Sequence, residues 1–87
     1  MGNEITIVKA EMSPDMQQAA IRCAVRAKNM YREKMNIAEF MKDTFNEEYG
    51  KNWQCIIGDF AHSITHDSNY YINLKWGSEE IVLFKTS

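Results

Sequence analysis

The residues best suited to chemistry gather in one short stretch of the sequence. His62, His66 and Asp67 lie close together, and Cys55 precedes them. Imidazole, thiolate and carboxylate are usual ligands of zinc. The β-branched residues between the histidines favour a strand, however, in which His62 and His66 share a face but stand about 13 Å apart at ~3.3 Å per residue, too far for one ion. Cys55 and His62 could face each other in a hairpin, but no third ligand is visible, so ordinary strand or interface roles are favoured.

Other features of the sequence point away from an enzyme. There is no P-loop, dinucleotide-binding fingerprint or nucleophile elbow. The net charge is −2 and the ten Lys and Arg residues form no basic stripe, which argues against a nucleic-acid partner. No apolar run approaches the ~20 residues needed to cross a bilayer. We therefore expect residues 1–87 to form a single small cytosolic domain with no catalytic residues, no cofactor and no metal.

The first half of the sequence predicts a strand followed by two helices. Residues 4–11 alternate roughly, as in an edge strand. Ser13, Pro14 and Asp15 form a strong helix start, and an apolar stripe follows at steps of three and four. A capping box from Asn36 to Glu39 predicts a second helix over 37–49, which ends at a positive-φ Gly50.

The second half predicts strands joined by tight turns. Gly58-Asp59 joins two β-rich runs, 53–57 and 60–66, and the local pattern indicates a hairpin. A clearer hairpin joins 70–76 to 81–85 through Gly77-Ser78. Its two-residue loop predicts facing pairs, including Leu74 with Ile81 and an ion pair between Lys75 and Glu80.

The same stretch resembles a known protein family. Trp53, the run Cys55-Ile56-Ile57-Gly58, Phe60-Ala61 and the run Ile64-Thr65-His66-Asp67 resemble the signature of the eight-kilodalton class of dynein light chains. Met12-Ser13, Met16-Gln17-Gln18, Cys23-Ala24, Phe45, Tyr49 and Leu83-Phe84-Lys85 extend the resemblance over almost the whole chain. It implies an α+β fold in which two helices pack on an antiparallel β-sheet, as a strand-swapped homodimer with two peptide-binding grooves. The strand 60–66 would cross to the partner's sheet, in disagreement with the local hairpin.

The resemblance also implies which residues form the binding and dimer surfaces. An extended peptide would join the sheet by β-strand addition. The peptide-binding residues would be Lys9, Lys34, Met35, Phe60, Ala61, His62, Ser63, Ile64, Thr65, His66, Tyr71, Asn73, Lys75, Glu80 and Val82. The dimer interface would include Lys42, Gln54, Ile57, His62 and Ser63.

The function that the resemblance implies is that of a non-catalytic dimeric hub. Such a hub binds short linear motifs in disordered segments, including dynein intermediate chain, as a light chain of a cytoplasmic dynein motor on the microtubule cytoskeleton or as a dimerising scaffold. No nucleic acid or membrane partner is expected. The alternative is a divergent monomeric or closed-groove structural subunit of one assembly.

Several positions depart from the family pattern. Met35 stands where a lysine is usual, Asn73 and Lys75 replace groove tyrosines, and Glu80 replaces a small apolar residue. Relatives prefer peptides with a Thr-Gln-Thr core, and these replacements predict a different core. Gln54 replaces an interface histidine and cannot gain charge between pH 5 and 8. The connector at Asp59 is one residue short for the family.

Overall fold

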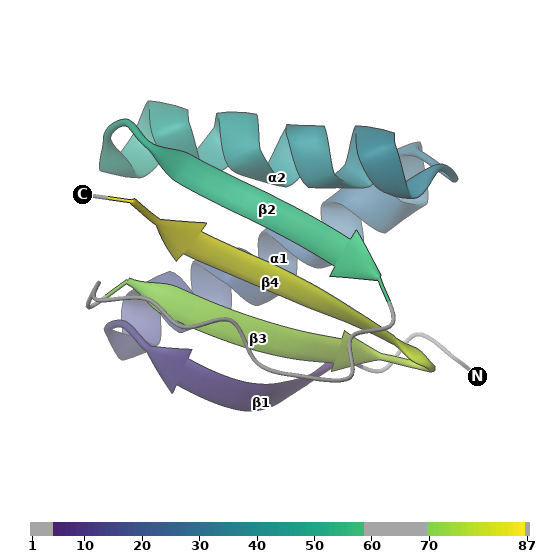
Figure 1. The fold of residues 1–87 in the computed structure, drawn as a ribbon, viewed down its shortest axis with the longest axis horizontal. Coiled ribbons are helices and arrows are strands. Elements are labelled where there is room, and N and C mark those ends of the chain that lie inside the picture. The colour runs from purple at the N-terminus through teal and green to yellow at the C-terminus, as the bar shows by residue number, and fades with distance from the viewer. Residues whose placement is uncertain (1–4, 59–69, 87) are drawn as a thin grey trace.

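The computed structural model describes residues 5–58 and 70–86, which form two helices and four strands. In chain order these elements are β1 (Ile5–Glu11), α1 (Pro14–Met30), α2 (Lys34–Tyr49), β2 (Trp53–Gly58), β3 (Tyr71–Trp76) and β4 (Glu79–Lys85). The strands make one antiparallel sheet in the order β1-β3-β4-β2. Both helices cover the same face of this sheet (Figure 1), α2 along β2 and α1 behind the central strands. The expected α+β fold, two helices on an antiparallel sheet, is confirmed.

The local signals at the first helix act as the sequence predicts. Ser13 is the N-cap, and its hydroxyl oxygen accepts a hydrogen bond from the backbone N–H of Met16 at 3.3 Å. Pro14 occupies the first helical position, where its missing N–H costs nothing. The uneven alternation of residues 4–11 also has a cause, because a bulge between Ile7 and Lys9 shifts the register of β1 against β3.

The second helix begins earlier than the sequence predicts. Its N-cap is Glu33, which makes no side-chain capping bond, and the backbone N–H of Ile37 already donates to the Glu33 carbonyl at 3.1 Å. The predicted capping box from Asn36 to Glu39 is therefore wrong. A salt bridge between Lys34 and Glu79 of β4 ties the added turn to the sheet. At the other end the helix stops at Gly50 (φ 95°), as predicted.

The core between helices and sheet combines small residues of α1 with large apolar residues of the strands. Ala20, Ala24 and Ala27 are fully buried, which lets α1 approach its neighbours closely. The sheet contributes its helix-facing residues, among them Ile72, Leu74, Trp76, Ile81 and Leu83. None of the helices in the described ranges combines the length and apolar character that a bilayer-spanning helix requires.

An aromatic cluster joins α2 to the start of β2. The Trp53 ring lies edge-on to Phe45 with centroids 4.9 Å apart, and Tyr49 and Tyr70 flank it. The backbone N–H of Trp53 donates to Asn46 Oδ1 at 2.9 Å, while Lys85 Nζ donates to the Tyr49 carbonyl. These contacts fix α2 against β2, so that β2 is held as the outermost strand on its side of the described sheet.

Candidate peptide-binding site

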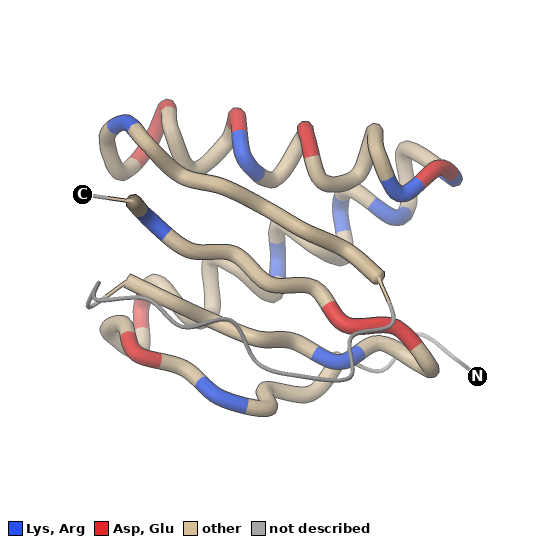
Figure 2. Tube along the Cα trace, in the orientation of Figure 1, with Lys and Arg blue, Asp and Glu red and all other residues tan. Residues whose placement is uncertain are grey.

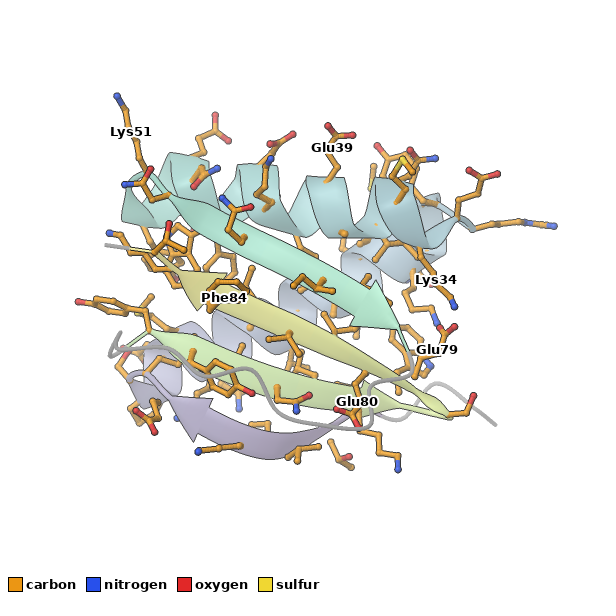
Figure 3. The ribbon with its side chains drawn as sticks, in the orientation of Figure 1. Lys34, Glu39, Lys51, Glu79, Glu80 and Phe84 are labelled. Atoms are coloured by element: carbon orange, nitrogen blue, oxygen red, sulfur yellow. The ribbon has the colours of Figure 1, made fainter. Side chains whose placement is uncertain are left out.

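The face of the sheet that is turned away from the helices collects most of those predicted groove residues that the structure describes. Because side chains alternate along a strand, residues next to the core positions of β3 and β4 point outward. Figure 3 shows this for Glu80 and Phe84, which lie in front of the sheet while α1 lies behind it. We call this the outer face; it is formed by Lys9, Gln54, Ile56, Tyr71, Asn73, Lys75, Glu80, Val82 and Phe84.

The strand register arranges these side chains in rows across the sheet. Lys9 pairs with Asn73, Asn73 with Val82, and Val82 with Ile56. The rows on either side contain Lys75 opposite Glu80 and Tyr71 opposite Phe84. The predicted hairpin register is thus confirmed, and the structure brings Lys9 together with the β3 and β4 positions.

Asn73 is the most unusual residue of the outer face. Its side chain is only 7% exposed, Nδ2 donates to Glu80 Oε1 at 3.1 Å, and Oδ1 has no hydrogen-bond partner. An unsatisfied buried acceptor costs about 1–3 kcal/mol. Asn73 therefore offers an acceptor that a donor group from a ligand could satisfy.

The predicted ion pair between Lys75 and Glu80 is wrong, although the two residues do face each other in the register. Glu80 instead accepts the hydrogen bond from Asn73. The salt bridge found between described residues is the one between Lys34 and Glu79. The Lys75 ammonium group is left exposed to solvent, where a bound side chain could reach it.

The start of α2 lies apart from these rows. Lys34 reaches Glu79 at the turn end of the β3–β4 hairpin (Figure 3). Met35, in the same helical turn, is 78% exposed. Lys34 is therefore placed at the hairpin end of the sheet, beside a residue that pairs with the core residue Trp76, and neither Lys34 nor Met35 belongs to the rows of the outer face.

The β2 strand is one of the two edge strands of the described sheet, and a further strand could add to it. Within residues 5–58 and 70–86, β2 pairs with β4 alone. Gln54 and Ile56 are exposed on it, Ile57 is half-buried, and Lys42 on the neighbouring α2 is also half-buried. An open edge of this kind is a template for strand addition. The predicted crossing strand 60–66, with interface residues His62 and Ser63, lies outside the described residues.

Neither cysteine of the domain has the lowered pKa of a reactive thiol. Burial, with a smaller contribution from nearby Cys23, raises the pKa of the Cys55 thiol to about 12. The pKa of Cys23 is also raised by burial. In the described part of the chain no group of three or more His, Cys, Asp or Glu residues could hold a metal ion, and His62, His66 and Asp67 lie outside that part.

Comparison with known proteins identifies the family of this chain. The family model for dynein light chain type 1 matches residues 4–86. The chain belongs to the dynein light chain family. It is 36% identical over 84 residues to the cytoplasmic dynein light chain of Emericella nidulans, across 95% of this chain and 89% of that protein.

Solved structures with the same fold agree with the family assignment. The dynein light chain-like domain of the Fasciola hepatica calcium-binding protein FhCaBP2 superposes with a TM-score of 0.79 at 26% identity, covering 98% of this chain and 93% of that domain. The DLC-like domain of CsTAL3 gives a TM-score of 0.77 at 19% identity over 95% of this chain and 93% of its own, a likeness of fold alone.

Two residues on the outer face were not among those that the sequence suggested. Ile56 and Phe84 share rows with Val82 and Tyr71. The predicted hairpin register already placed Phe84 opposite Tyr71, which was the signal for it. Ile56 could not be found in that way, because the pairing of β2 with β4 joins segments far apart in the sequence.

Proposed function

We propose that this dynein light chain is a non-catalytic dimeric hub that binds short extended peptides by β-strand addition. It would serve in the cytoplasmic dynein complex, with dynein intermediate chain among its partners, or as a scaffold that pairs other chains. Family and fold support the light chain role. The observation that carries the binding proposal is the mixed polar and apolar outer face, which brings together Lys9 and the predicted β3 and β4 positions; the β2 edge beside it pairs with β4 alone within the described residues, so a strand of a second copy could add there.

Dimerisation is what turns one binding face into a hub. Two copies hold two grooves in a fixed arrangement, so a second linked peptide binds as an intramolecular event and gains effective concentration. A small domain also buries only about 60–65% of its unfolded surface, which makes added burial in an interface valuable for stability. Gln54, Ile57 and Lys42 are the described residues proposed to lie at this interface.

Light scattering on a size-exclusion peak tests the dimer at micromolar concentration. We expect the mass of two chains for the natural protein. Ile56→Lys places a charge on β2, an edge strand of the described sheet, and should shift the peak to one chain, because lysine on an edge strand opposes pairing. Val8→Lys on the other edge strand, β1, is the matched control and should leave the dimer intact. A natural chain that elutes as a monomer contradicts the hub.

A second candidate function is a closed-groove structural subunit. One observation favours it: Tyr71, Asn73 and Val82 are already 2%, 7% and 2% exposed in a single chain, although they face away from the helices. A groove so little exposed would have to open before a peptide could enter. A monomer that binds no peptide would support this function in place of the hub.

A further inference from the structure

A second surface, on the helices and not on the sheet, has the features of a docking site. A groove with a volume of about 620 Å³ runs between α1 and α2. Its floor is apolar and includes Ala19, Cys23, Phe40 and Phe45. Val25 and Met30 line the same groove and are 39% and 55% exposed. This groove shares none of its lining residues with the outer face.

The two rims of the helix groove carry opposite charge. On α1 the rim is formed by Arg22 and Arg26, one turn apart and both exposed. On α2 it is formed by Glu48, and an adjoining hollow that shares Phe40 and Thr44 with the groove extends it along Glu39, Asp43 and Glu47. Figure 2 shows blue segments along α1 and recurring red segments along α2. The salt bridge between described residues is that of Lys34 with Glu79, so none of the rim residues forms a salt bridge within this part of the chain.

We propose that this groove binds an amphipathic helix of a partner protein, with basic residues on one flank and acidic residues on the other. The apolar stripe of that helix would cover the floor, its basic flank would meet the α2 rim, and its acidic flank would meet Arg22 and Arg26. The floor from Ala19 to Met30 is about 16 Å long at 1.5 Å per residue, which corresponds to three helical turns.

The secondary structure of the occupant follows from hydrogen bonding. The groove is lined by side chains of two helices whose backbone groups are already paired within each helix, so it has no free backbone edge. An extended peptide buried there would leave its own N–H and C=O groups unpaired, at a cost comparable to lost hydrogen bonds. A helix satisfies its backbone internally, and packing an amphipathic helix into an apolar groove is a common mode of recognition.

Fluorescence anisotropy with a designed peptide tests this proposal. The probe is a labelled 18-residue helix with leucines at helical spacing, arginines on one flank and glutamates on the other. We expect saturable binding that weakens in 0.5 M salt, because exposed charge pairs are screened. Binding that is absent at millimolar peptide overturns the proposal.

Charge variants locate the site and test the rims. Arg22→Glu with Arg26→Glu makes both rims acidic and should weaken binding of the probe about tenfold, while it strengthens binding of a second peptide with arginine on both flanks. Asp43→Lys with Glu47→Lys should weaken binding of the probe by a similar factor and should also weaken binding of the second peptide. Arg32→Glu with Lys51→Glu changes the net charge as the α1 variant does but lies outside the groove lining, and should have little effect. All these residues are exposed, and thermal melts followed by circular dichroism check that the variants fold.

Two results would contradict the proposed partner. Binding of the probe that is insensitive to both rim variants would place the helix elsewhere on the molecule. If light scattering shows that the rim variants change the number of chains per particle while the sheet-edge variant Ile56→Lys does not, then a second copy covers the groove and not a partner helix. Neither result bears on peptide binding at the outer face.

Discussion

The two faces of the sheet are built from alternate residues of the same strands, yet they differ in character. Toward the helices, Ile72 and Leu74 of β3 are fully buried in an apolar core. Toward the outside, Asn73 retains an unpaired acceptor and Lys75 is exposed. The helix-facing side is an apolar core packed within one chain, in which Trp53 Nε1 is the described buried polar atom without a hydrogen-bond partner. The outer face has polar groups, and the β2 edge beside it pairs only with β4 within the described residues, so this is the side on which a partner is proposed to bind.

Thiol reactivity should show the largest contrast between the faces. At pH 8 a Cys55 thiol with a pKa of about 12 is almost entirely protonated, so it should react with a disulfide reagent on the order of a thousandfold more slowly than an ordinary exposed cysteine. A cysteine introduced by Lys75→Cys on the outer face should react at the ordinary rate. Mass spectrometry resolves the two sites, and equal rates would show that the helix-facing side is open.

The same pKa shift predicts the direction of a stability change. The folded state holds the Cys55 thiol protonated, whereas an unfolded chain releases that proton near the ordinary thiol pKa. This contribution to the free energy of unfolding is therefore fully present below about pH 8.5 and is lost as the pH rises toward 12. Urea titrations at pH 8 and pH 10 on the natural chain and on Cys55→Ala isolate it. A natural chain whose loss of stability is no greater than that of the variant contradicts the assignment.

Truncation of two neighbouring residues of β3 should show that the two faces contribute differently to the free energy of unfolding. Leu74→Ala removes a fully buried side chain and should lower the free energy of unfolding by about 2–5 kcal/mol. Lys75→Ala, the next residue along β3, should change it by less than about 0.5 kcal/mol. Urea unfolding measures both. Comparable losses from the two variants would mean that the outer face also supports the fold.

The smallest expected effect is the response of the dimer to mild acid. The family resemblance implies an interface histidine at the position of Gln54, and glutamine gains no charge between pH 5 and 8. Sedimentation at pH 7 and pH 5 should therefore find the proposed dimer of the natural chain unchanged, while Gln54→His should weaken the dimer at pH 5. Full dissociation of the natural chain over this interval would assign the pH response to His62 or His66.

The sequence predicts those parts of the fold that depend on neighbours in the chain. Ser13 and Pro14 start α1, Gly50 ends α2, and Gly77-Ser78 fixes the β3–β4 register, because each acts through local geometry. The start of α2 was missed for the opposite reason. Its first turn is held by a contact from Lys34 to Glu79, far along the chain, and a local capping pattern carries no information about it.

The candidate site also has features that the local sequence predicts and features that it does not. Alternation along the strands predicted that Tyr71, Asn73 and Lys75 share a face, and the register confirms it. The partner of Glu80 could not be predicted, because the choice between Lys75 and Asn73 depends on side-chain positions within a few ångströms. The exposed edge of β2 likewise depends on the order of all four strands, which the local pattern does not specify.

A calorimetric titration of a Thr-Gln-Thr peptide tests most directly whether the outer face binds peptides with a changed preference. The titration is made into the natural chain and into the double variant Lys75→Tyr with Glu80→Ala. A peptide side chain laid over the natural pair must satisfy it or strip its water, and an unsatisfied polar group costs about 1–3 kcal/mol. The double variant should therefore bind about tenfold to a hundredfold more tightly, with one peptide per chain. Equal affinity of the two proteins would contradict the changed preference, and absence of binding to both would contradict peptide binding at this face.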